Sequence, residues 1–139
     1  MDDAQRRRLV LDTNVVLDLL VFDDPRIAGL RTALKDGAAD WLITQAMRDE
    51  LERVLAYPRI ARHMQSHGLG TAALLLRCDS LSQVRPVASR STVRCTDTDD
   101  QMFIDLAVAH RAYLLSKDLA VLRLRKRLAM LGVPVATPS

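Results

Sequence analysis

The fold is decided by a stretch near the start of the chain, Leu9-Val10-Leu11-Asp12-Thr13-Asn14. A short apolar run that ends at once in polar residues is typical of a strand buried on both faces of a parallel sheet. Two further runs, residues 41–43 and 113–115, have the same form, and weaker strand candidates lie at residues 83–87 and 133–136. The sequence therefore predicts a sheet of up to five short strands.

Helical patterns fill the segments between these runs. Asp24 before Pro25 has the residue types that begin a helix, as has Thr44, and Thr98-Asp99-Asp100-Gln101 matches a capping box. Gly132 and Pro134 end the last helix. Helices are expected over residues 14–21, 25–35, 45–55, 98–110 and 119–131, with two more within 58–80. Strands that alternate with helices indicate a parallel α/β sheet with right-handed crossovers.

The composition fits a single globular domain over residues 1–139. Apolar residues make up 49% and charged residues 27%, and no apolar run is long enough to span a membrane. Cys78 and Cys95 do not form a disulfide framework, so we expect two buried thiols and a cytoplasmic, reducing location. The net charge of +3 permits a polyanionic partner, whereas an aromatic content of 4% argues against a surface that stacks bases.

Acidic residues follow the expected strands or open the helices after them. Asp12 follows the first strand, Glu50 lies on the second turn of the helix after the second strand, and Asp118 follows the fourth strand. A run of acids at residues 97–100 opens another helix. In open parallel sheets, ligands bind beyond the carboxyl ends of the strands, which all lie at one edge. We therefore expect four segments to bring carboxylates to the same edge.

Each acid also has a simpler structural interpretation. Asp12 and Asp118 are suitable N-caps, and Asp99 or Asp100 complements a helix dipole. Glu50 lies beside an apolar stripe, where it either extends to water or needs a partner. The helical period does not choose between Asp99 and Asp100, because both share a face with apolar residues. Convergence at one edge is harder to explain by capping, since crowded carboxylates repel strongly at low dielectric unless a cation is present.

Ligands that are all oxygen favour Mg²⁺ or Mn²⁺ over Zn²⁺. One or two such ions activate a water and stabilise the attacking and leaving oxygens of a phosphodiester. His63 and His67, four residues apart, lack a nearby third ligand and are expected on a solvated helix face. A basic group on the 119–131 helix either binds a nucleic-acid backbone or is an ordinary solvated face, and it comprises Arg123, Arg125, Lys126 and Arg127.

Together these motifs resemble those of the PIN domain family. The matching segments are residues 11–14, 50–55 with Pro58, 97–103 leading to Ala107, and 116–118, so the resemblance covers about residues 9–135. The spacing is most similar to the bacterial branch described as toxins of toxin–antitoxin systems. The resemblance implies a three-layer sandwich in which helices flank a five-stranded parallel sheet of order 3-2-1-4-5.

The resemblance also implies roles for particular side chains. Asn14 and Ser116 match supporting polar positions, and Asp99 matches an extra acid of this branch. Gln101 departs from the pattern, because the branch often has an acid there, and the turn at residues 116–120 lacks one further acid. The implied metal-binding and catalytic acids are Asp12, Glu50, Asp100 and Asp118.

The resulting hypothesis is a metal-dependent endoribonuclease that uses Mg²⁺ or Mn²⁺ and is the toxin of a toxin–antitoxin pair. RNA is then the substrate, a small antitoxin covers the acidic edge, and a homodimer is in keeping with the family. The alternative is a non-catalytic module of the same fold that binds RNA or protein and keeps the acids as caps. A phosphotransfer enzyme with Asp12 as nucleophile is disfavoured, because Asn14 stands where a second aspartate is needed.

Overall fold

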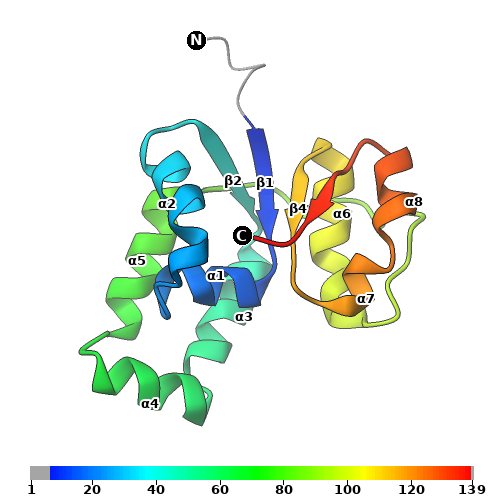
Figure 1. Ribbon diagram of the computed structural model, residues 1–139. Coiled ribbons are helices and arrows are strands. Elements are labelled where there is room, and N and C mark those ends of the chain that lie inside the picture. Colours follow the sequence, from blue (N-terminus) through cyan, green and yellow to red (C-terminus); the bar gives the residue numbers. More distant parts are fainter. Residues whose placement is uncertain (1–6, 139) are drawn as a thin grey trace.

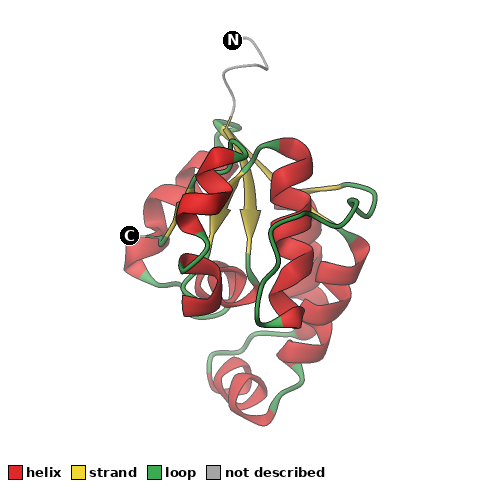
Figure 2. Ribbon diagram, turned by 90° about the vertical axis from the view of Figure 1, so that its right-hand side faces the viewer, coloured by secondary structure: helices red, strands yellow, loops and turns green. Residues whose placement is uncertain are grey.

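The computed structural model describes residues 7–138 and has a five-stranded sheet between two layers of helices (Figure 1, Figure 2). The order across the sheet is β3-β2-β1-β4-β5, and every neighbouring pair of strands is parallel. This confirms the predicted fold class and strand order. The strands are β1 (Arg7–Leu11), β2 (Ala39–Ile43), β3 (Ser82–Val84), β4 (Tyr113–Leu115) and β5 (Val135–Ala136).

Helices connect the strands and pack on both faces of the sheet. Two short 3₁₀ helices, η2 (Pro25–Ile27) and η3 (Thr98–Asp100), precede α2 and α6. The α-helices are α1 (Thr13–Leu20), α2 (Ala28–Lys35), α3 (Gln45–Leu55), α4 (Pro58–Ser66), α5 (Thr71–Leu81), α6 (Gln101–His110), α7 (Leu119–Leu122) and α8 (Arg125–Met130).

The centre of the sheet is buried from both sides. Val10 of β1 lies opposite Leu114 of β4, and both side chains are 0% exposed. Helix α6 packs on these two strands and contributes Ile104 and Leu106, which are equally buried. Burial on both faces explains why the central strands are continuous apolar runs rather than alternating ones.

Most of the predicted helix starts are confirmed. The carboxylate of Asp24 accepts a hydrogen bond from the backbone N–H of Arg26, with Pro25 at the first helical position. The hydroxyl oxygen of Thr44 accepts one from the N–H of Met47 and so caps α3. The two helices expected within residues 58–80 are α4 and α5, and both cysteines are buried free thiols.

Two details of the predicted helices are wrong. The expected capping box is absent, because Asp97 caps η3 while the Gln101 side chain turns back to the loop before it. The helix expected over residues 119–131 is two helices, α7 and α8. A tight turn divides these two helices. In this turn the N–H of Leu124 donates to the carbonyl of Val121, three residues earlier, at 2.9 Å.

The acidic edge is fixed where β1 and β4 end side by side. The backbone N–H of Asp12 donates to the carbonyl of Leu115 at 3.1 Å, so the chain leaves both strands at the same level. Asp12 and Ser116, which are distant in sequence, therefore become neighbours. Among residues 7–138, no helix has both the length and the apolar character needed to cross a lipid bilayer.

Candidate metal centre

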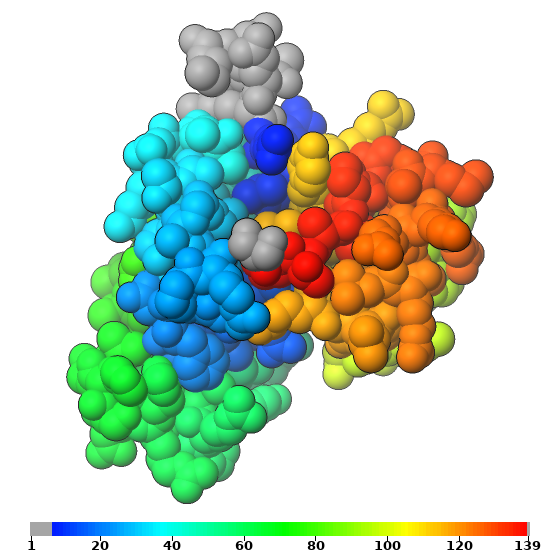
Figure 3. Space-filling model, in the orientation of Figure 1, coloured from blue at the N-terminus to red at the C-terminus, as the bar shows by residue number. Residues whose placement is uncertain are grey.

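A cleft of about 610 Å³ opens at the carboxyl edge of the sheet. Figure 3 shows a hollow at this lower edge of the molecule, between the green residues on the left and the orange residues on the right. The walls of the cleft come from α1, α3, α4, η3, α6 and the turn after β4. The lining residues are Asp12, Thr13, Asn14, Leu17, Asp18, Phe22, Asp24, Glu50, Val54, Tyr57, Arg59, Ile60, Asp100, Phe103 and Lys117.

Asp12 is both a helix cap and part of this cleft. One carboxylate oxygen accepts a hydrogen bond from the N–H of Val15 at 2.9 Å, and the other accepts one from the Ser116 hydroxyl at 2.5 Å. The residue is only 3% exposed, and burial raises the pKa of its carboxyl group despite these two hydrogen bonds. The capping interpretation is therefore correct without excluding a second role.

Ser116 holds two acidic segments together. Its hydroxyl group, 0% exposed, donates to Asp12 and accepts a hydrogen bond from the backbone N–H of Asp118 at 3.1 Å. The Asp118 carboxylate in turn accepts from the N–H of Ala120 at 2.8 Å and caps α7. A buried serine that uses both its donor and its acceptor fixes the distance between the two turns.

Asp100 is the most perturbed acid of the cleft. Burial, followed by contact with Asp118 and repulsion from Asp97 and Asp12, raises the pKa of its carboxyl group to about 8. Its Oδ2 atom is buried and has no hydrogen-bond partner among residues 7–138. Carboxylate oxygens of Asp97, Asp100 and Asp118 lie within 4.8 Å of one another. Three acids this close repel one another unless a proton or a cation lies among them.

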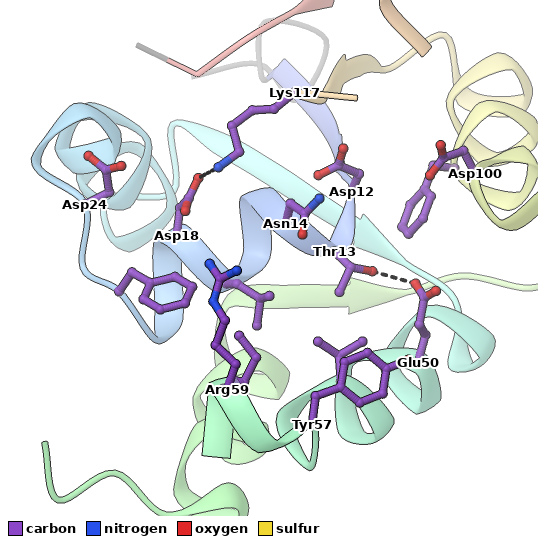
Figure 4. Close-up of a pocket in the computed structure, with 15 residues that line it drawn as sticks. Asp12, Thr13, Asn14, Asp18, Asp24, Glu50, Tyr57, Arg59, Asp100 and Lys117 are labelled. Atoms are coloured by element: carbon purple, nitrogen blue, oxygen red, sulfur yellow. Dashed lines mark hydrogen bonds and ion pairs between the residues drawn. The ribbon is translucent and has the colours of Figure 1, made fainter. Parts of the chain in front are cut away.

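Glu50 enters the cleft from the opposite wall, on α3 (Figure 4). The Thr13 hydroxyl donates to its Oε2 atom at 2.5 Å. Thr13 follows Asp12 directly, so one turn of chain orients carboxylates on both sides of the cleft. The sequence left open whether Glu50 extends to water or needs a partner, and the structure gives it the Thr13 hydroxyl group as a partner.

Other residues singled out from the sequence lie in different places. Asn14 lines the cleft and is exposed, whereas Asp99 is exposed and does not line it. The four basic residues of the 119–131 segment are exposed, and none lines the cleft. Figure 1 shows α8 beside β5 and above α7, away from the edge where β1 ends. His63 of α4 and His67, which follows the helix, stack with 4.1 Å between their ring centroids.

Lys117 and Arg59 are the cations that do line the cleft. Lys117 forms an ion pair with Asp18 at 2.5 Å, and Arg59 extends from the first turn of α4 into the cleft (Figure 4). Sequence reasoning missed both, together with Thr13 and Tyr57. Lys117 was findable, because it stands between two residues of the acidic edge. Arg59 and Tyr57 flank Pro58, which signals a helix start but does not reveal where that helix points.

The donor set fits a hard divalent cation. The groups gathered within 4.8 Å of one another are carboxylate oxygens of Asp97, Asp100 and Asp118, and the unpartnered Oδ2 atom belongs to one of them, Asp100. Of these three acids Asp100 lines the cleft, together with Asp12 and Glu50. Mg²⁺ and Mn²⁺ prefer such ligands. The arrangement therefore has the chemistry of a site for a divalent cation.

A five-stranded parallel sheet of this order, with acids gathered at its carboxyl edge, defines an α/β domain built around an acidic site. The chain belongs to the PIN domain family, whose model matches residues 8–120. A chain in the crystal structure of VapBC2 from Rickettsia felis, bound to a DNA fragment from their promoter, has the same fold with a TM-score of 0.64. It is 12% identical in sequence, and the match covers 95% of this chain and 99% of that one. No curated protein matches significantly.

Proposed function

We propose that this protein is a metal-dependent endoribonuclease in which Asp12, Glu50, Asp100 and Asp118 hold Mg²⁺ or Mn²⁺. The observation that carries the proposal is the buried, unpartnered Oδ2 atom of Asp100, which lines the cleft and lies in a group of acids with Asp97 and Asp118. A group of this kind is costly to bury without a partner. Membership of the PIN domain family supports the nuclease assignment.

The residues around the acids position them for this role. Ser116 and the first turn of α1 hold the Asp12 carboxylate, and Thr13 holds Glu50. Asp100 has a pKa of about 8 in the metal-free protein, so it must release its proton before it can act as a ligand. A bound divalent cation supplies Lewis acidity for water activation and stabilises charge on the phosphodiester oxygens.

The test is cleavage of several structured and single-stranded RNAs by the purified protein with Mn²⁺, and again with EDTA. We expect fragments only with the metal, and none from Asp100→Asn. Asp49→Asn is the matched control, because Asp49 is an exposed aspartate bonded to Gln45, outside the cleft. Absence of metal-dependent cleavage across all the RNAs would contradict the proposal.

The non-catalytic alternative predicts a different result in a metal titration. If the acids serve only as helix caps, the native protein should show no Mn²⁺ binding that depends on Asp12. The Asp12→Asn variant should then behave like the native protein in the titration. Calorimetric titration of the native protein and of this variant separates the two functions, because a metal centre requires Mn²⁺ binding that the substitution weakens or removes.

We further propose that the protein is the toxin of a toxin–antitoxin pair and that a small antitoxin covers the cleft. The similarity of fold to a chain of the VapBC2 structure supports this proposal. A short reading frame beside the gene, whose product co-purifies with this protein and blocks its cleavage of RNA, is the expected finding. Light scattering of the free protein tests the homodimer that accompanies this proposal.

A further inference from the structure

The cleft is lined by aromatic side chains as well as by acids. The chain has one Trp, two Tyr and two Phe, and three of these five aromatic residues, Phe22, Tyr57 and Phe103, line the cleft. Phe103 is buried at 3% exposure, whereas Tyr57 is 56% exposed. The low aromatic content of the sequence argued against a surface that stacks bases. The overall percentage did not show that three of the five aromatic residues would line one cleft.

Tyr57 is held in place by its backbone. It precedes Pro58, which disfavours helical geometry for the residue before it, and its φ and ψ angles of −62° and 137° are extended. The Tyr57 N–H donates to the Val54 carbonyl, and its own carbonyl accepts from Ala61. The ring therefore stands at a fixed corner between α3 and α4, on the cleft wall that also carries Glu50 (Figure 4).

Arg59, two residues after Tyr57, supplies a cation to the same cleft. Lys117 is paired with Asp18, whereas Arg59 forms no ion pair within the part of the chain that the structure describes. In Figure 4 its guanidinium group points into the cleft, toward Asn14 and Asp18. An unpaired guanidinium group offers a fork of N–H donors that matches phosphate oxygens.

We propose that Tyr57 and Arg59 bind one nucleotide of single-stranded RNA beside the cleaved bond, a proposal that rests on the proposed nuclease function. The base stacks on the Tyr57 ring, and its phosphate binds Arg59. Of the three aromatic rings of the cleft, Phe103 is buried and Phe22 is partly buried, so Tyr57 is the most exposed. One largely exposed ring suits a flat base better than the long apolar face of a protein helix. Bases within a duplex are stacked on their neighbours and do not reach such a ring.

Binding of a fluorescein-labelled eight-nucleotide oligoadenylate tests the base contact. Anisotropy is measured in Ca²⁺, and a gel verifies that the RNA remains intact. Tyr57→Leu keeps an apolar side chain but removes the ring, and we expect roughly 5- to 100-fold weaker binding. Tyr57→Phe keeps the ring and restores binding to within about twofold of the native value. Oligomers with one abasic position should bind the native protein more weakly, with a smaller loss for Tyr57→Leu.

The salt dependence of binding tests the phosphate contact. Arg59→Ala should lower the slope of log K against log salt concentration by about 0.7, the value for one phosphate of a single strand. Arg62→Ala is the control, because Arg62 is an exposed arginine of the same helix whose side chain bonds the Pro58 carbonyl outside the cleft. A structural effect of Arg59 on folding would not change this slope selectively.

The outcomes distinguish this inference from the proposed function. RNA binding that depends on Tyr57 and Arg59, without metal-dependent cleavage, would overturn the nuclease and leave the nucleotide site standing. Cleavage that both Tyr57→Leu and Arg59→Ala leave unchanged, with unchanged RNA affinity, would overturn the nucleotide site and assign this wall of the cleft to a protein partner. Failure of the native protein to bind single-stranded RNA would also overturn it.

Discussion

At the scale of single residues, Asp100 is a source of instability in the metal-free protein, because its carboxyl group lies against Asp118 and Asp97. Asp100→Asn removes that repulsion while keeping the size of the side chain. We expect a gain of about 1 kcal/mol, which raises the melting temperature by roughly 3–5 °C in EDTA at pH 8, together with loss of RNA cleavage. A variant that melts below the native protein in EDTA would show that Asp100 only complements its helix.

The pH dependence of stability follows from the same carboxyl group. Its pKa in the folded state is about 8, above the value of about 3.9 in an unfolded chain, so the folded state holds the proton more tightly. This contribution to stability is fully present below pH 4 and is lost as pH rises through 8. In EDTA, the melting-temperature advantage of Asp100→Asn should therefore grow from pH 5 to pH 8.5. An advantage that stays constant over this range would contradict the assignment.

Gln101 explains a departure from the family pattern. Its amide oxygen accepts from the N–H of Cys95, and its amide nitrogen donates to Val93 and Asp105. The bonds to Cys95 and Val93 thus tie the loop that leads into Asp97 and Asp100 to the start of α6, and the bond to Asp105 holds the amide group within that helix. An acid at this position would lose both donated bonds and repel Asp105, so glutamine holds the loop where the related branch often has an acid.

Gln101→Glu should therefore loosen the loop. We expect a loss of about 1–3 kcal/mol of unfolding free energy, the usual cost of leaving buried groups unpaired, and weaker Mn²⁺ binding. Gln45→Glu is the matched control, because Gln45 also donates to an aspartate four residues on but is exposed, and we expect a change within about 0.5 kcal/mol. Equal effects in urea unfolding would show that the loop does not depend on Gln101.

The choice between Asp99 and Asp100 shows where sequence reasoning ends at this scale. A regular helix from residue 98 gives both residues an apolar face. The structure begins instead with the 3₁₀ turn η3, which turns Asp100 toward Asp118 and leaves Asp99 exposed. Such a turn has no signal in the residue types alone, because Asp97 and Thr98 are both acceptable caps.

At the scale of elements, the strands were predictable and the last helix was not. The central strands are buried on both faces, so their apolar runs match β1, β2 and β4 closely. The edge strands β3 and β5 are short and partly exposed, which is why their bounds were less clear. The break between α7 and α8 falls among residues that all favour helices, and a local turn rather than composition creates it.

Helix α3, which carries Glu50, depends on its cap. Thr44 is 4% exposed, and its hydroxyl oxygen accepts from the N–H of Met47 at 3.3 Å. Thr44→Ala should cost about 1 kcal/mol and lower the melting temperature by roughly 3–5 °C. Thr44→Ser keeps the hydroxyl and should recover most of that loss. If both variants melt at the same lower temperature, packing of the methyl group rather than capping accounts for the effect.

At the scale of the whole molecule, binding of a metal ion to the folded protein should raise the free energy of unfolding. A cation that binds only the folded state stabilises it by mass action, by about 2.7 kcal/mol at a concentration 100 times its Kd. Thermal melts should therefore show a rise in melting temperature with Mn²⁺ for the native protein and a much smaller rise for Asp100→Asn. Equal shifts for both proteins would place the bound metal elsewhere.

The distribution of charge was the hardest whole-molecule property to predict. The basic segment around Arg125 is conspicuous in the sequence, but its side chains lie outside the cleft, while Arg59 and Lys117 lie within it. Order along a chain predicts which edge of a parallel sheet an acid reaches, because strand ends are fixed by the fold. It does not predict the direction of α4, which depends on how helices pack.

The hydrogen bond between Ser116 and Asp12 joins residues 104 positions apart, and β4 lies between β1 and β5. Asp12 and Glu50 therefore leave the ribosome well before Asp100, Ser116 and Asp118. At ordinary elongation rates the interval between Asp12 and Ser116 is roughly 5–20 s. A nascent chain holds an incomplete set of these acids throughout that time, so the acidic site assembles only after β4 has been synthesised and inserted.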